Sequence, residues 1–152
     1  MNIADDLIKD KNRELISVTE DTLVFDAVAV MAENKVGSIL IKKDDEIVGI
    51  WTERDLLYCV ARHELDCTSK SIGSCMSKNL KYCEWNDSVY KLMDMFLGLR
   101  LRHLLVKRDG KYIGLISSGD VMRATIQEKN RELSQLNASS SWDYYEEWKK
   151  QD

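Results

Sequence analysis

Residues 49–55 read Gly-Ile-Trp-Thr-Glu-Arg-Asp, and residues 114–120 read Gly-Leu-Ile-Ser-Ser-Gly-Asp. Both stretches contain a glycine, two apolar residues, a hydroxyl residue, two variable positions and an aspartate, in the same order. One such pattern is weak, because Ser/Thr-x-x-Asp also describes an ordinary helix start with a carboxylate in its first turn. Two copies, each between a strand-like and a helix-like run, indicate an internal duplication.

The shift that takes position 49 to position 114 also relates the segments around the two stretches. The first unit is predicted to contain an extended entry and then a helix, two strands and a helix, at 16–18, 24–34, 38–41, 47–51 and 56–63. The second unit repeats this order, with the entry at 82–83, a helix from 89, strands at 103–106 and 112–116, and a helix from Asp120. For the two first helices, Asp21 and Thr22 are the predicted N-cap in one unit, and Asn86 to Ser88 in the other.

Units of about 45 residues are too small to bury a core alone, so two of them must pack together. The predicted fold is therefore α/β (α+β): two tandem β-α-β-β-α units packed about a pseudo-twofold axis, followed by a C-terminal helical and aromatic extension. The predicted segments are an N-terminal arm or helix at 1–15, unit one at 16–63, a connector at 64–79, unit two at 80–126 and the extension at 127–152.

The extension has its own composition. Its first residues are expected to continue the last helix, and Asn137 to Ser141 are expected to form a flexible break. An acidic tail follows, which contains the aromatic residues Trp142, Tyr144, Tyr145 and Trp148.

Composition excludes several classes of protein. The chain has 152 residues, of which 44% are hydrophobic and 32% charged, as in a soluble globular protein. A net charge of −4 argues against a nucleic-acid surface, which would normally be basic. No apolar run approaches the roughly 18–20 residues that cross a membrane. The acidic N-terminus lacks the features of a signal peptide, so a cytoplasmic location is expected.

Four cysteines follow one another at even intervals, at positions 59, 67, 75 and 83. There is no Cys-x-x-Cys pair, and His63 and His103 do not complete a zinc pattern, so no metal site is predicted. In a cytoplasmic chain such cysteines are expected to be reduced thiols.

Over about residues 8–126 the chain resembles a tandem pair of cystathionine-β-synthase (CBS) domains, also called a Bateman module. The resemblance rests on the two Gly-x-x-Thr/Ser-x-x-Asp stretches, on Thr-Glu-Arg-Asp-Leu at 52–56, and on Ile-Gly-Ser-Cys-Met-Ser at 72–77. It implies two clefts related by the pseudo-twofold axis, and adenine nucleotides as their usual ligands.

The resemblance also implies roles for the repeated residues. Asp55 and Asp120 would accept hydrogen bonds from ribose hydroxyls, since a fixed carboxylate accepts two donors well. Thr52 and Ser117 would contact phosphate at a helix N-terminus. The alternative is that both pairs are merely helix caps.

Apolar and backbone groups would hold the adenine. The matching positions are Leu15, Ile16, Val36, Gly37 and Ser38 for the Ser117–Asp120 cleft, and Leu80, Lys81, Leu101, Arg102 and His103 for the Thr52–Asp55 cleft. Core and strand-end roles explain these residues equally well, and His103 fits a hydrogen-bonded strand histidine. Arg102 fits a phosphate contact or a solvated surface cation. Because the first unit has Gly37 where the second has Arg102, the clefts would differ in charge, and one high-affinity site is expected.

No catalytic constellation is visible: no histidine is placed to serve a nucleophile, and there is no Walker-type loop or acidic metal cluster. The first hypothesis is a regulatory module, homodimeric like its relatives, that binds AMP, ADP, ATP or a related adenosyl ligand and transmits occupancy to a protein partner. The second is a ligand-free interaction or scaffold protein that uses its C-terminal tail. The third is S-adenosylmethionine or NAD binding. Membrane and DNA partners are not expected.

Overall fold

The computed structural model describes residues 2–11, 15–62 and 66–149, and the side chains of this part up to residue 138. Unit one contains β1 (Ser17–Thr19), α2 (Val24–Asn34), β2 (Ser38–Lys43), β3 (Glu46–Thr52) and α3 (Glu53–Ala61). Unit two contains β4 (Tyr82–Glu84), α5 (Val89–Leu99), β5 (His103–Arg108), β6 (Lys111–Ser117) and the start of α6 (Ser118–Lys149). The remaining elements are α1 (Ala4–Lys11), the 3-10 helix η1 (Cys67–Ser69) and α4 (Ile72–Cys75). The predicted α+β fold with two tandem units is confirmed.

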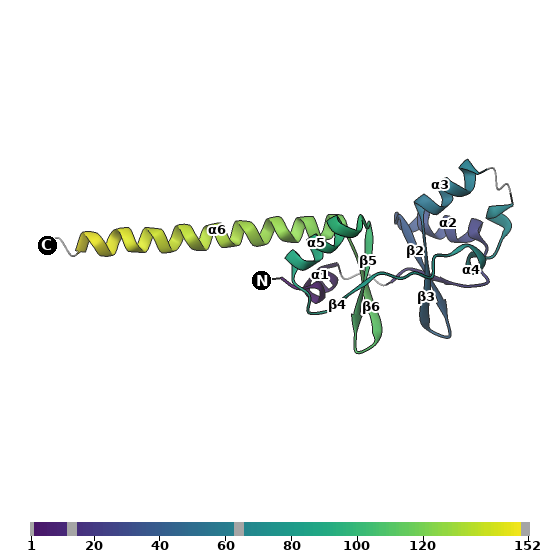
Figure 1. Cartoon of the computed structure of the whole chain (residues 1–152), viewed down its shortest axis with the longest axis horizontal. Coiled ribbons are helices and arrows are strands. Elements are labelled where there is room, and N and C mark those ends of the chain that lie inside the picture. Colours follow the sequence, from purple (N-terminus) through teal and green to yellow (C-terminus); the bar gives the residue numbers. More distant parts are fainter. Residues whose placement is uncertain (1, 12–14, 63–65, 150–152) are drawn as a thin grey trace.

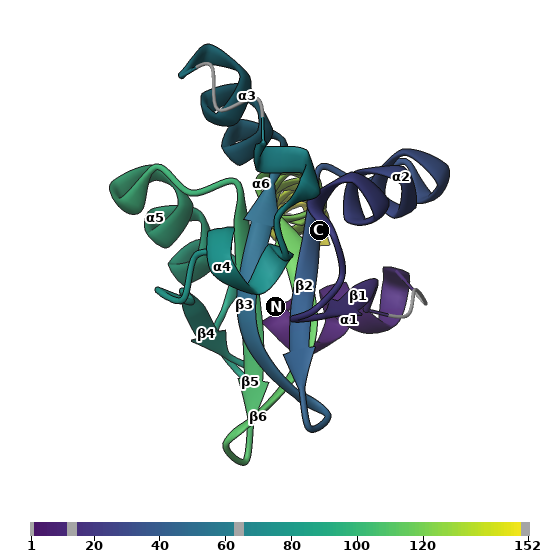
Figure 2. The same cartoon turned by 90° about the vertical axis from the view of Figure 1, so that its right-hand side faces the viewer.

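The two sheets repeat each other in register. Each has a short parallel strand, then an antiparallel hairpin, in the orders β1-β2-β3 and β4-β5-β6. Ser38 pairs with Thr52 and His103 pairs with Ser117, so the shift found in the sequence holds for the backbone. Both hairpins point the same way and lie side by side (Figures 1 and 2).

The hairpin turns need left-handed backbone at both central positions. These are Asp44 and Asp45 in the first hairpin, with φ of 48° and 63°, and Asp109 and Gly110 in the second, with φ of 50° and 79°. Positive φ at both positions is the type I′ geometry, which matches the twist of the flanking strands. Aspartate tolerates the left-handed region better than most residues, so the first hairpin closes without glycine.

The predicted cap of α2 is wrong, whereas that of α5 is confirmed. The N-cap of α2 is Leu23, which makes no side-chain cap hydrogen bond. Its neighbour Val24 instead donates its N–H to the carbonyl of Lys70 at 3.0 Å, so the connector satisfies the end of the helix. In α5 the Ser88 hydroxyl accepts from the N–H of Lys91 at 3.3 Å.

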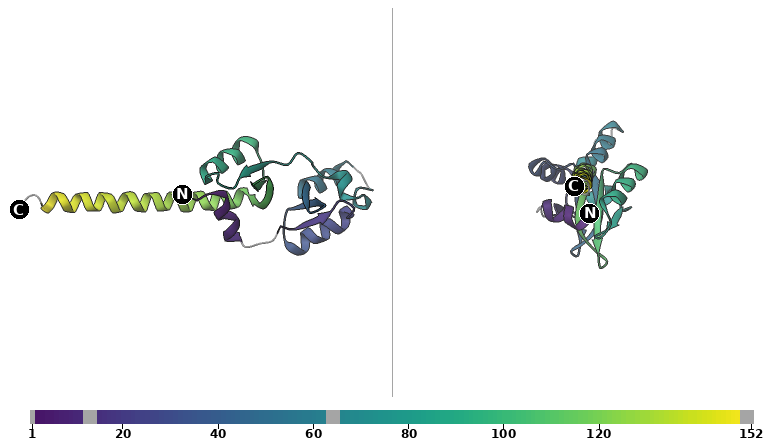
Figure 3. Two further views of the ribbon diagram at one scale, coloured as in Figure 1. Left: turned by 90° about the horizontal axis from the view of Figure 1, so that it is seen from below. Right: turned by 90° about the vertical axis from the view of Figure 1, so that its left-hand side faces the viewer.

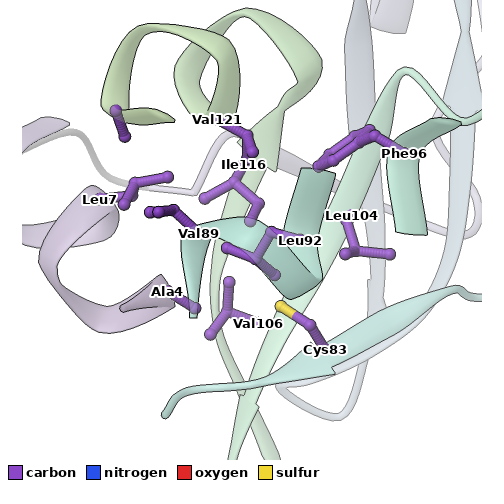
Figure 4. Close-up of a cluster of buried hydrophobic side chains, with 11 residues drawn as sticks. Ala4, Leu7, Cys83, Val89, Leu92, Phe96, Leu104, Val106, Ile116 and Val121 are labelled. Atoms are coloured by element: carbon purple, nitrogen blue, oxygen red, sulfur yellow. The ribbon is translucent and has the colours of Figure 1, made fainter. Parts of the chain in front are cut away.

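The segment before each unit packs on the other unit. α1 precedes unit one, yet Ala4 and Leu7 lie in the core of unit two, beside Val89 and Val106 (Figure 4). The backbone reinforces this packing, because Val89 N–H donates to the carbonyl of Asn2 at 3.1 Å. α4 precedes unit two, and its neighbourhood contributes Ile72 and Met76 to the core of unit one. The predicted segment boundaries stay a prediction. Each unit's core is completed by residues from the segment that precedes the other unit.

We expect Gly114→Ala to destabilise the protein, because an added Cβ would lie 2.6 Å from Cγ1 of Ile8 on α1. Overpacking of this kind costs about 1–3 kcal/mol. Gly98→Ala is the matched control: it lies in α5, its Cβ would meet nothing within 4 Å, and helix propensity should stabilise it by about 0.5–1 kcal/mol. Thermal denaturation of both variants tests this; equal melting points would contradict it.

The predicted break at Asn137 to Ser141 is wrong, because α6 runs without interruption to Lys149 and projects away from both units (Figures 1 and 3). Residues 137–141 read Asn-Ala-Ser-Ser-Ser, which contains neither glycine nor proline. Once a helix exists, each added residue gains a hydrogen bond, so residues with moderately poor helix propensity also become helical. The side chains of the four aromatic tail residues lie outside the described residues.

The prediction of reduced cysteines is wrong for one pair. Cys59 on α3 and Cys67 on η1 are joined as a disulfide, with their Cα atoms 6.2 Å apart. The packing of η1 against unit one brings the two together, which their spacing in the sequence could not show. Cys75 and Cys83 are free thiols, and burial raises the pKa of Cys83 to about 12. His63 lies outside the described residues.

Candidate functional site

Two cavities lie where the units meet, and each has a volume of about 290 Å³. We call them the Asp55 cleft and the Asp120 cleft. The residues predicted from the sequence divide between them as expected. Thr52, Asp55, Leu80, Lys81, Leu101, Arg102 and His103 line the Asp55 cleft, and Leu15, Ile16, Val36, Gly37, Ser38, Ser117 and Asp120 line the Asp120 cleft. The geometry brings these residues together; their role in binding stays a prediction.

The Asp55 carboxylate is fixed by the residue at the end of β3. Thr52 donates its backbone N–H to Oδ2 of Asp55 at 2.8 Å and its hydroxyl to the same oxygen at 2.9 Å. Both contacts use one oxygen, so Oδ1 has no hydrogen-bond partner among the described residues. The Thr52–Asp55 pair is therefore a helix cap that also leaves an acceptor free beside a cavity.

The start of α3 is tied to the start of β2. Glu53 donates its N–H to the carbonyl of Gly37 at 3.0 Å. A Cβ on Gly37 would lie 2.8 Å from Oε1 of Glu53, the flexible end of that side chain, so a larger residue here would displace the carboxylate of Glu53 rather than the backbone. In unit two the same bond joins Ser118 N–H to the carbonyl of Arg102 at 3.1 Å. These bonds hold each repeated aspartate at a defined place on the rim of its sheet.

Cations gather around the Asp55 cleft. The sequence predicts Lys81 and Arg102 there, and the structure adds Arg54 and Arg100. None of the four has an ion-pair partner in the part of the chain that the structure describes. The signal in the sequence is that the repeat pairs Arg100 with another basic residue, Lys35. In the structure both residues end a helix in the left-handed conformation. The cleft thus combines a free carboxylate oxygen with unpaired positive charge.

The Asp120 cleft has a similar cap but an additional cation. Ser117 donates its N–H to Oδ2 of Asp120 at 2.7 Å and its hydroxyl at 2.6 Å. The same oxygen forms an ion pair with the ammonium of Lys11, from α1. Burial alone would raise the pKa of Asp120, but hydrogen bonds from Lys11 and Ser117 outweigh it and hold this pKa below its usual range. Lys11 was missed in the sequence because it lies outside both repeated stretches.

His103 borders both clefts, as do Gly37 and Leu115. Burial, together with the nearby charge of Lys11, lowers the pKa of His103 below its usual value. The side chain is therefore uncharged at neutral pH, and it can donate or accept a hydrogen bond without adding positive charge to either cleft.

The described residues contain no group of three or more His, Cys, Asp or Glu side chains that could hold a metal ion. Among the same residues, no helix combines the length and the apolar character needed to cross a membrane.

Comparison with known proteins gives consistent matches. The model of the CBS domain matches residues 5–62 and 71–126. The mitochondrial CBS domain-containing protein CBSX3 of Arabidopsis thaliana is 34% identical over 143 residues, which cover 88% of this chain and 69% of the relative. A CBS-domain containing protein of Agrobacterium tumefaciens has a solved structure that covers 82% of this chain and 99% of its own, with 32% identity and a TM-score of 0.76.

A more distant structure, CBSX2 in complex with AMP, is 24% identical and has a TM-score of 0.70. It covers 85% of this chain and 99% of its own. At this identity the likeness concerns the fold alone.

Proposed function

The chain belongs to the CBS-domain family as a tandem pair, and on that premise we propose that it is a regulatory module that binds an adenine nucleotide in the Asp55 cleft. Its role is to transmit occupancy to a partner, and no catalytic role is proposed. The observation that carries the proposal is the composition of this cleft. A fixed carboxylate with one free oxygen lines the same cavity as four cations that have no ion-pair partner among the described residues.

The charges of the cleft match the parts of a nucleotide. Oδ1 of Asp55 is free to accept a ribose hydroxyl, and a charged acceptor makes a strong hydrogen bond. Arginine presents several donors in a fixed fork that suits phosphate, which applies to Arg54, Arg100 and Arg102. We assign phosphate to these arginines, together with Thr52 at the N-terminus of α3.

Apolar side chains provide a place for the base. Ile50, Leu80 and Leu101 line the same cavity, and aliphatic walls bind a flat aromatic ring by burying its faces. We assign the adenine to these walls. The complex of CBSX2 with AMP supports an adenine nucleotide as the ligand, at the level of the shared fold.

Transmission follows from where the cleft lies. Its lining comes from both units, with Asp55 in unit one and Arg102 in unit two, so a ligand contacts both at once. A ligand can shift an equilibrium between two arrangements only by binding one of them better. We propose that the nucleotide favours one arrangement of the two units and that a partner protein senses it.

We also propose that the module works as a homodimer. Large apolar side chains are exposed on α3 and α5: Leu57 is 65% exposed, Val60 67% and Leu97 69%. Exposed large apolar side chains on helices of both units are typical of a protein–protein interface. The cytoplasmic location stays a prediction.

A second candidate function is that of an interaction protein that needs no ligand. The observation in its favour is α6, a helix of 32 residues whose Leu133 and Leu136 are 57% and 64% exposed. In that case the clefts would stay empty, and α6 would bind the partner.

We expect purified protein to be stabilised by AMP, ADP or ATP in a thermal shift series that also includes S-adenosylmethionine and NAD. A ligand at a hundred times its dissociation constant adds about 2.7 kcal/mol to the free energy of unfolding. Absorbance near 260 nm first shows whether the protein carries nucleotide from its purification. If nucleotide-free protein responds to none of the five, the interaction protein is the better interpretation; a response to S-adenosylmethionine or NAD alone would change the ligand class.

A further inference from the structure

Lys11 is held in the Asp120 cleft by the helix that carries it. Its ammonium forms the ion pair with Asp120 and also donates to the carbonyl of Leu115 at 3.3 Å. The two charged side chains are 33% and 16% exposed, so the pair is largely shielded from water. Since Ala4 and Leu7 anchor α1 in the core of unit two, the backbone of Lys11 is already placed near Asp120, and only the side chain has to be ordered to form the ion pair.

The segment that corresponds to α1 brings no cation to the Asp55 cleft. Ile8 covers Gly114, and Met76 covers Gly49 at the equivalent place in unit one, so Ile8 and Met76 are counterparts. Three positions after Ile8 stands Lys11, and three positions after Met76 stands Asn79. Asn79 lines the Asp55 cleft, but an amide carries no charge. Among the described residues, the charge of Asp55 is therefore not compensated by an ion pair.

The two aspartates are thus unequal as ribose acceptors. Oδ2 of Asp120 already accepts from Ser117 twice and from Lys11, whereas Asp55 accepts only from Thr52 within the described part of the chain. Among the described residues, Oδ1 of Asp120 is as free as Oδ1 of Asp55, but it belongs to a carboxylate whose charge Lys11 already compensates. A ribose that donates both of its hydroxyls to Asp120 would have to displace the ammonium from Oδ2. Displacement would separate a shielded ion pair, and losing one partner of such a pair is unfavourable.

We propose that Lys11 is a specificity-determining residue that competes with the ligand for Asp120, so that the Asp55 cleft fills first and the Asp120 cleft binds weakly. This inference rests on the proposed function, because it concerns the same ligand. The inference adds a cause for the difference in affinity between the clefts. That cause is Lys11 on α1, which lies outside the two repeated stretches.

The test is calorimetric titration of the full chain with AMP, comparing wild type with Lys11→Met. Methionine keeps an unbranched, flexible side chain, shorter by a single atom, and removes its charge. We expect one tight site in wild type, and in Lys11→Met a second site whose affinity rises by about tenfold or more. Adding Asp120→Asn to Lys11→Met should abolish this gain, since the freed carboxylate is what binds.

Lys9→Met is the matched control. Lys9 lies on the same helix and pairs with Asp5 at 2.7 Å, but it is 69% exposed and lines neither cleft. It should leave both affinities unchanged. Circular dichroism of each variant shows whether α1 stays folded.

Three results would overturn the inference. Lys11→Met could weaken the second site, which would make Lys11 a phosphate ligand; it could change nothing; or its gain could survive Asp120→Asn. In each case the proposed function would still stand if the tight site remains and is lost in Asp55→Asn. Absence of AMP binding in both wild type and Lys11→Met would reject the two together.

Discussion

Asp55→Asn is expected to weaken AMP binding to the tight site by about a hundredfold, which corresponds to about 2.7 kcal/mol. The carboxylate would accept hydrogen bonds from ribose, and each hydrogen bond to a charged group contributes about 1.5–3 kcal/mol. Asparagine keeps the shape of the side chain and one carbonyl oxygen, so Thr52 still has an acceptor at the start of α3. The change therefore removes the charge with little change to the cap.

The measurement is calorimetric titration, with unfolding by urea run beside it to detect any loss of stability. Asp26→Asn is the matched control, since Asp26 lies exposed in the first turn of α2 and lines neither cleft. It should bind AMP like wild type. If Asp55→Asn also binds like wild type, the Thr52–Asp55 pair is a helix cap only, and the nucleotide, if any, lies elsewhere.

The repeated part of the site could be predicted because both copies obey one spacing. Thr52 and Asp55 have the same spacing as Ser117 and Asp120. The shift between the units also relates the residues at the strand starts that are expected to line the two clefts. On this basis Lys81 and Arg102 were expected in the Asp55 cleft, and both line it. The spacing of a short stretch, when it occurs twice in the chain, thus predicts which distant residues lie together in the fold.

The rest of the site depends on contacts that the repeat does not encode. Lys11 comes from the N-terminal helix α1 and contacts Asp120, which is distant in sequence. The segment of α1 matches the segment around Met76 with a longer shift than the one that relates the two repeated stretches, so a comparison at the shorter shift does not find Lys11. The pairing of Cys59 with Cys67 likewise depends on how η1 packs. The continuous α6 was missed for another reason: the polar run at 137–141 was interpreted from composition, although helix propagation outweighs weak local preferences.

Leu7→Ala is expected to lower the free energy of unfolding by about 2–5 kcal/mol, the usual cost of truncating a large aliphatic side chain in a core. Leu7 is 5% exposed and packs with Val89 and Ala124 of unit two. The size of this effect tests the crossed packing directly, because an arm that merely precedes unit one would leave Leu7 at the surface, where such changes cost less than about 0.5 kcal/mol.

Leu133→Ala makes the same chemical change on the exposed part of α6, where the side chain is 57% exposed, and it should alter stability by less than about 0.5 kcal/mol. Urea unfolding at one protein concentration compares the two variants with wild type. Since α1 also carries Lys11, loosening it should release Asp120, so Leu7→Ala is expected to bind a second AMP more tightly as well as to unfold more easily. Equal stabilities of the two variants would show that α1 is not part of the core of unit two.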